Sequence, residues 1–132
     1  MKIMILRVAG FFGLCAVLSG AFAAHGLKLL LEPEQMETFR TGVLYHFIHT
    51  LCLLVIGLTY VKKSTLLILT SVFFMLGILL FSGSLYLLSC RNILGIENWK
   101  FLGPLTPLGG LCFCIGWFLL IFSKTRLPEK TL

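Results

Sequence analysis

The chain carries little charge and contains no aspartate. Charged residues make up 12% of its 132 residues, whereas soluble domains carry about a quarter. Hydrophobic residues make up 58%, and the mean hydropathy is +1.02. A soluble fold of this size could not cover its surface with so few charges, so lipid is expected around most of the chain. The lack of aspartate also excludes a Ser-His-Asp triad.

The cysteines lack the spacing of a redox or zinc site. There are five, an odd number, and no two of them form a CxxC pair. Cys112 and Cys114 are two residues apart, so on a helix their side chains point in different directions. Redox chemistry is one alternative, but small apolar fillers of a membrane core are the favoured interpretation.

Four apolar stretches are long enough to cross about 30 Å of hydrocarbon. They lie at about 3–24, 41–61, 66–89 and 105–122. The link between the second and third is very short, which makes those two helices antiparallel neighbours. We therefore predict an all-α integral membrane protein, a single domain over residues 1–132 with four transmembrane helices in an antiparallel bundle.

The first span carries small residues at steps of three or four, which favours close approach of another helix. These are Ala9, Gly13, Ala16, Gly20 and Ala24. A cleaved signal peptide is an alternative, since Ala21-Phe22-Ala23 resembles a cleavage site. The length of the run and the small-residue face favour an uncleaved helix. In the third span, Gly77, Gly83 and Ser84 predict a second helix contact face.

The links contain prolines at informative positions. Pro33 suits the first turn of a helix that starts at about Glu32. It predicts a short interfacial helix between the first two spans, lying at the membrane surface. Pro104 and Pro107 predict an entry turn followed by the first turn of the fourth span, because the interior of an unbroken helix does not accommodate both without cost. A ligand site at a broken helix is the alternative there.

The net charge of +6 arises from eleven Lys and Arg residues that fall mostly between the spans or at the ends. This placement excludes a nucleic-acid-binding face. With four spans, the side that holds both termini carries Lys2, Arg7, Lys62, Lys63, Lys124, Arg126 and Lys130, and the other carries Lys28, Arg40, Arg91 and Lys100. The positive-inside rule then predicts that both termini are cytoplasmic.

Several motifs spread over nearly the whole chain carry a family resemblance. They are residues 20–26 (GAFAAHG), 39–49 (FRTGVLYHFIH), 80–86 (LFSGSLY) and 102–110 (LGPLTPLGG), followed by Gly116-Trp117. The chain resembles the small four-span membrane family that includes bacterial YgdD-type inner-membrane proteins and animal transmembrane protein 256, a domain of unknown function. The resemblance implies an uncleaved four-span protein of a bacterial inner membrane, and it implies no activity.

The head of the second span carries Tyr45, His46 and His49, and His25 ends the first span on the same side of the membrane. Ionisable residues inside a bilayer usually face the bundle and find partners. Three interpretations follow. The three histidines bind a metal or haem, or a histidine titrates in proton or small-solute movement, or His46, His49 and Tyr45 form hydrogen bonds to the serines of the third span and to the links outside.

Arg40 is expected at the membrane surface, either as an anchor that extends toward water or as a clamp for a lipid headgroup or another anion. No Asp or Glu lies within a predicted span, which disfavours both coupled transport and a metal centre. The favoured function is therefore a non-catalytic multi-pass membrane protein with no cofactor. It would act through contacts with lipid, with its own copies or with a partner membrane protein.

Overall fold

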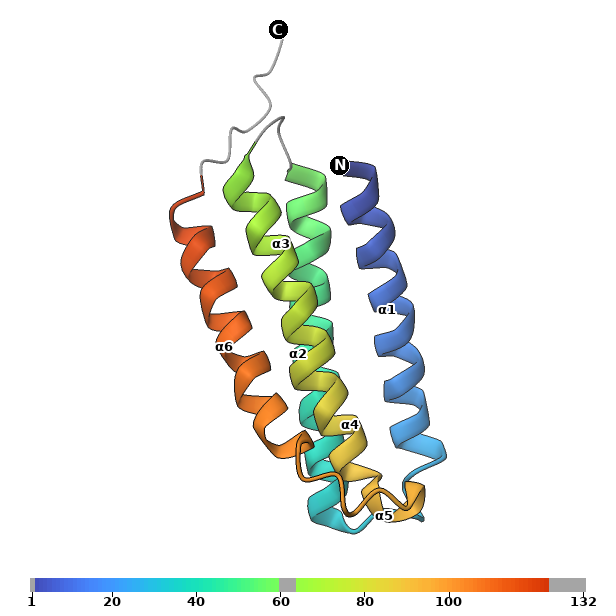
Figure 1. Ribbon diagram of the computed structural model, residues 1–132. Helices are drawn as coiled ribbons and strands as arrows, with labels where there is room; N and C mark the ends of the chain where they lie inside the picture. The colour runs from blue at the N-terminus through green and yellow to red at the C-terminus, as the bar shows by residue number, and fades with distance from the viewer. Residues whose placement is uncertain (1, 60–63, 124–132) are drawn as a thin grey trace, which may run out of the picture.

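The computed structural model describes residues 2–59 and 64–123, and this part of the chain is helical with no strand. The helices are α1 (Lys2–His25), α2 (Pro33–Thr59), α3 (Thr65–Gly77), the π-helix η1 (Ile78–Ser82), α4 (Gly83–Ser89), α5 (Arg91–Leu94) and α6 (Leu102–Ile121). Because α3, η1 and α4 form one continuous rod, four helices are long and apolar enough to cross a membrane (Figure 1). The predicted all-α four-helix class is confirmed.

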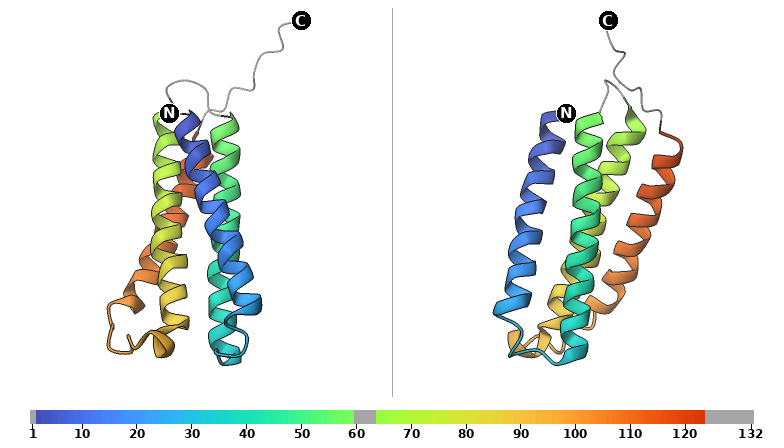
Figure 2. Two further views of the ribbon diagram at one scale, coloured as in Figure 1. Left: turned by 90° about the vertical axis from the view of Figure 1, so that its right-hand side faces the viewer. Right: turned by 180° about the vertical axis from the view of Figure 1, so that it is seen from behind.

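Long helices that follow one another in the chain run antiparallel (Figure 1). The start of α1, the end of α2, the start of α3 and the end of α6 all lie at one end (Figure 1). Figure 2 shows that α1 and α6 stand on opposite sides, with α2 and the α3–η1–α4 rod between them. Consequently α2 can contact α1 on one side and α6 on the other.

The outer faces of the helices are apolar. Phe11 and Leu18 of α1 and Leu111 and Phe118 of α6 are among the large hydrophobic side chains left exposed. Such exposure is expected of a bundle surrounded by lipid. Lipid tails are as apolar as these side chains, so no hydrophobic effect drives the side chains into the interior. Several of the residues that are buried inside the bundle are polar or aromatic.

The segment between α1 and α2 differs from the prediction. Residues 26–32 form turns, and α2 begins at Pro33 and continues unbroken to Thr59. Pro33 does occupy the first turn, but no separate short helix lies between α1 and α2, because nothing after Pro33 breaks the helix. Leu27 and Leu31 of the turn are buried against Met36 rather than spread on a surface.

The start of α6 also differs from the prediction. The helix begins at Leu102, so Pro104 lies in its first turn and Pro107 lies inside it. The first helical N–H groups need no intrahelical partner, which is why Pro104 fits. Pro107 leaves only the carbonyl of Gly103 without its usual donor. The expected turn at these prolines is therefore a helical turn.

Some expected features lie outside the described residues. These are residues 60 and 61 at the end of the expected second span, and five of the basic residues used for the orientation: Lys62, Lys63, Lys124, Arg126 and Lys130.

Glycines let the third rod and α6 pack closely. A Cβ on Gly77 would lie 2.3 Å from the ring of Phe113, and a Cβ on Gly116 would lie 2.6 Å from the ring of Phe74. Each helix thus inserts one phenylalanine over a glycine of the other. A Cβ on Gly83 would meet nothing within 4 Å, so of the expected contact face it is Gly77 and Ser84 that pack against α6.

The π-helix gives α6 its closest approach. A Cβ on Gly109 would lie 2.3 Å from the backbone nitrogen of Phe81. Nearby, the Ser84 hydroxyl lies 2.9 Å from the Phe81 carbonyl and 2.7 Å from the Thr106 hydroxyl. Since the single Ser84 proton is donated to the carbonyl, Thr106 donates to Ser84. A hydrogen bond and a backbone contact therefore hold α6 to η1 and α4.

Candidate functional site

His49 lies in the interior of the bundle with both ring nitrogens in use. The side chain is 3% exposed. Its Nε2 lies 3.2 Å from the indole nitrogen of Trp117, which can only donate. Nε2 is therefore the acceptor, and Nδ1 carries the proton that is donated to the Tyr45 carbonyl at 2.8 Å. The imidazole is held as one neutral tautomer that links α2 to α6.

Aromatic rings enclose the same imidazole. The His49 ring stacks on Phe113 with 3.5 Å between centroids and 9° between planes, and Phe74 meets it edge-on at 5.2 Å. Phe113 can reach this position because Gly77 leaves room for it. With both nitrogens bonded and both neighbours apolar, His49 has no lone pair free for a metal.

His46 lies one helical turn nearer the start of α2 and has different surroundings. It is 4% exposed, and its Nδ1 lies 3.1 Å from the hydroxyl of Tyr86 in α4. The Tyr86 ring comes this close because Gly42 has no side chain, and a Cβ there would lie 2.9 Å from the ring. The ring of Phe12 in α1 meets the imidazole edge-on at 5.7 Å. His46 therefore faces α1 and α4.

The second nitrogen of His46 is buried without a partner. Its Nε2 makes no hydrogen bond within residues 2–59 and 64–123. Three hydroxyls share this condition, on Thr50, Thr70 and Ser82. Buried polar atoms are normally hydrogen-bonded to protein or to ordered water. Among the buried side chains of residues 2–59 and 64–123, these four atoms lack such a bond.

The three histidines do not assemble. His25 is exposed at the end of α1, and no group of three His, Cys, Asp or Glu side chains in residues 2–59 and 64–123 could hold a metal ion. His46 and His49 contact different helices, which gives no support to the alternative in which this pair shares one ligand. The hydrogen-bond partners also differ from the prediction: they are Tyr86 and Trp117, not the serines of the third span. The five cysteines are all free thiols.

Tyr45 contributes its ring and its backbone to the site. The side chain is 39% exposed, and its ring packs against Phe81 at 4.7 Å. Its carbonyl accepts the proton of His49. It therefore positions the imidazole from the same helix and lies between the bundle interior and the lipid.

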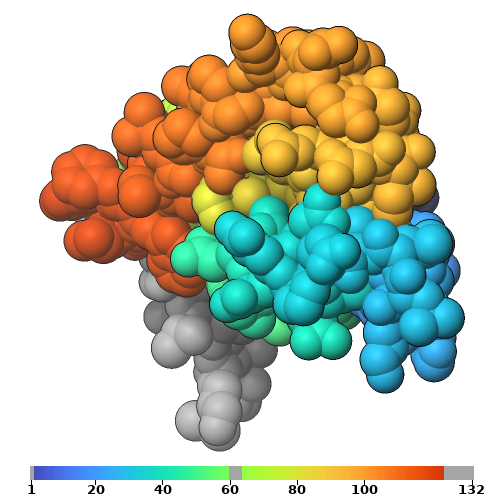
Figure 3. Space-filling model, turned by 90° about the horizontal axis from the view of Figure 1, so that it is seen from below, coloured from blue at the N-terminus to red at the C-terminus, as the bar shows by residue number. Residues whose placement is uncertain are grey.

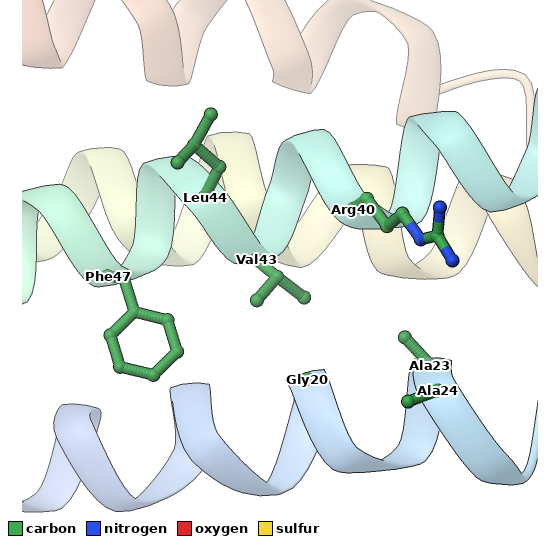
Figure 4. A pocket seen from close by; sticks show the side chains of 7 residues that line it. All are labelled: Gly20, Ala23, Ala24, Arg40, Val43, Leu44 and Phe47. Atoms are coloured by element: carbon green, nitrogen blue, oxygen red, sulfur yellow. The ribbon is translucent and has the colours of Figure 1, made fainter.

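Two open pockets lie toward the end of the bundle that carries the turn of residues 26–32. Figure 3 looks onto this end, where the start of α2 lies beside the segment around α5. A polar pocket of about 370 Å³ lies there, lined by residues that include Glu32, Glu34 and Arg91. The second pocket, of about 420 Å³, lies between α1 and α2 and includes Arg40 (Figure 4). Arg40 is exposed, as both interpretations of it required.

Sequence reasoning missed the two partners of the histidines. Tyr86 and Trp117 both lie within the motifs that carried the family resemblance, residues 80–86 and Gly116-Trp117. Their place within these motifs is the sequence feature that could have marked them as candidate partners. The helix-helix geometry that brings each to its histidine could not be derived from spacing along the chain.

Comparison with known proteins gives a consistent result. A family model described as "Protein of unknown function (DUF423)" matches residues 19–110. The membrane protein YwdK of Bacillus subtilis is 37% identical over 128 residues, which cover 96% of this chain and 98% of that protein. The inner membrane protein YgdD of Escherichia coli K12 is 35% identical over 126 residues, 95% of this chain and 92% of that protein. No solved structure matches the chain.

Proposed function

Because the chain belongs to the DUF423 family of membrane proteins of unknown function, we propose that it is non-catalytic and acts through contacts with lipid, with its own copies or with partner membrane proteins. The relatives carry no enzymatic name. The observation that supports the proposal is the state of His49, whose two nitrogens are both bonded within the bundle. A group so engaged stabilises the helix packing and has no free site for a substrate.

The energetics of membrane proteins agree with a packing role. Hydrogen bonds between transmembrane helices contribute about 0.6 kcal/mol on average and rarely more than about 2 kcal/mol. Two such bonds, from His46 to Tyr86 and from Trp117 to His49, tie α2 to α4 and to α6. Together with the glycine contacts they fix the order of helices around α2. The outer apolar faces are then left for lipid and other proteins.

The proposal includes the location and the orientation. YgdD is an inner membrane protein by name, which supports a bacterial inner membrane, and the distribution of Lys and Arg supports cytoplasmic termini. A fluorescent reporter that folds only in the cytoplasm, fused after Leu132, is expected to be bright. The same reporter inserted between residues 28 and 29, in the turn after α1, should be dark. The reverse pattern would overturn the orientation.

The functional proposal is tested by a flux measurement and by crosslinking. Purified protein is reconstituted into vesicles with a pH gradient, and the decay of the gradient is compared with that in protein-free vesicles. Equal decay rates are expected. Crosslinking in native membranes should in parallel capture neighbouring lipids or proteins. A faster decay that falls in a His46→Gln variant, or a monomer with no captured neighbour, would refute the proposal.

One observation favours a second candidate function, movement of protons or a small solute. The four unpartnered buried atoms belong to His46, Thr50, Thr70 and Ser82, and such atoms are the ones that ordered water would bond. The same vesicle assay separates the candidates, because transport requires a flux that depends on His46. A His49→Gln variant is the matched control, since that imidazole has no free nitrogen.

A further inference from the structure

A groove of about 420 Å³ runs between α1 and α2 on the outside of the bundle. It is lined by small and aliphatic residues with one cation: Gly20, Ala23, Ala24, Arg40, Val43, Leu44 and Phe47. Figure 4 shows Val43 and Phe47 on the side of α2 that faces α1, with Arg40 toward the end of the groove where Ala23 and Ala24 lie. The groove thus has an apolar length and a charged end.

Small residues of α1 create this space. Gly20 lies opposite Val43, where even an added Cβ would be at an ordinary contact distance of 3.6 Å. Ala24 is exposed and contributes only a methyl group. These small side chains leave the groove between α1 and α2 open on the outside of the bundle.

Arg40 lies at the depth of a lipid headgroup. It immediately precedes the apolar stretch of α2, and Phe47 lies about 10 Å deeper along the helix. Arg40 is exposed, and none of the residues that line the groove with it is acidic. Its guanidinium therefore forms the charged, polar end of an apolar groove.

We propose that this groove holds one anionic phospholipid, with its phosphate on Arg40 and an acyl chain along Val43 and Phe47. The inference rests on the proposed function, since it names lipid as the contact made at this surface. A guanidinium binds phosphate through two parallel hydrogen bonds, and basic pockets between transmembrane helices suit anionic headgroups.

Charge complementarity selects a lipid over a second copy of the chain. A neighbouring helix that filled the groove would cover Arg40 with apolar side chains, and an unpaired buried charge is costly. A phospholipid instead supplies a phosphate at the interface and hydrocarbon below it. It matches both ends of the groove at once.

Native mass spectrometry of the purified protein tests this, with either phosphatidylglycerol or phosphatidylcholine added to the detergent. The wild-type chain should bind one phosphatidylglycerol at least about fivefold more tightly than phosphatidylcholine, since one surface arginine provides about that discrimination. Arg40→Gln should abolish the preference. Ala24→Leu, which fills the groove from an exposed position, should weaken binding of both lipids.

Matched variants lie on the same helices. Arg7→Gln removes another exposed arginine, and Ala21→Leu enlarges an exposed alanine of α1 that does not line the groove. Both should bind lipid as the wild type does. A preference that persists in Arg40→Gln, or that is lost equally in Arg7→Gln, would overturn the proposal. So would a dimer that disappears in Ala24→Leu while lipid binding is unchanged, because the groove would then hold a second copy.

The outcome is independent of the flux assay. A flux that depends on His46 would refute the proposed function while leaving lipid retention by Arg40 unaltered. Conversely, suppose that the protein shows no Arg40-dependent preference for phosphatidylglycerol and no flux. The groove is then not a lipid site, and contact with partner proteins or other copies remains as the proposed function.

Discussion

Replacing Gly109 with alanine should destabilise the bundle more than any other addition of a single methyl group to a glycine of α6. The new Cβ would lie 2.3 Å from the backbone nitrogen of Phe81, 2.7 Å from its Cα and 2.8 Å from the carbonyl carbon of Leu80. Favourable separations between such atoms are about 3.5–4.0 Å. Because the obstructing atoms are backbone, no side-chain rotation relieves the clash, so α6 must move away from η1 by about 1 Å.

The magnitude follows from two opposing effects. Overpacking a well-packed interior costs about 1–3 kcal/mol, and a backbone clash belongs at the upper end. Alanine is favoured over glycine within a helix by about 1 kcal/mol, which leaves a net loss of about 2 kcal/mol. The next residue provides the control, since a Cβ on Gly110 would lie 3.8 Å from the Phe81 ring, an ordinary contact. Gly110→Ala should therefore leave stability unchanged or raise it by up to about 1 kcal/mol.

Unfolding by titration with sodium dodecyl sulfate in mixed micelles, followed by far-ultraviolet circular dichroism, measures both variants. The difference of about 2–3 kcal/mol corresponds to roughly 30- to 160-fold in the unfolding equilibrium constant. Equal midpoints for Gly109→Ala and Gly110→Ala would refute the reasoning, because α6 would then not approach the π-helix as closely as the structure has it.

Two further predictions concern the hydrogen bonds between helices, measured by the same titration. Trp117→Phe removes the donor to the imidazole that stacks on Phe113 and should cost about 1 kcal/mol, whereas Trp99→Phe, in the exposed link, should cost nothing measurable. Tyr86→Phe removes the sole partner of the other α2 imidazole and should cost a similar amount; Tyr45→Phe, whose ring is 39% exposed, is its control. An equal loss within either pair would contradict the assigned bonds.

The sequence predicts the four long helices because the length of each apolar run is set by the thickness of the membrane. It predicts less about features that arise from contacts between helices. The π-helix at Ile78–Ser82 has no local signal. The prolines of α6 were misplaced because the rule against helical proline weakens in the first turns, where Pro104 needs no donor.

The position of the histidine partners depends on how the four helices are arranged around α2. Spacing alone shows that His46 and His49 lie three residues apart, which places them near one face and suggested a shared ligand. In the structure, the two side chains on that face contact different helices. His46 and His49 are separated by about 60° around the axis of α2. His46 contacts α1 and α4, whereas His49 contacts α3 and α6.

Because the two imidazoles contact different helices, they differ in how many of their ring nitrogens are hydrogen-bonded. His49 is saturated by Trp117 and the Tyr45 carbonyl, and it is stacked on Phe113. Within residues 2–59 and 64–123, His46 keeps one buried nitrogen without a partner. Of the two imidazoles, only that of His46 therefore has a nitrogen that could bind water, a proton or a solute inside the bundle, and a substitution at His49 should affect such binding only through stability. A variant series that lost flux at His49 with full helicity and an unchanged unfolding midpoint would contradict this assignment.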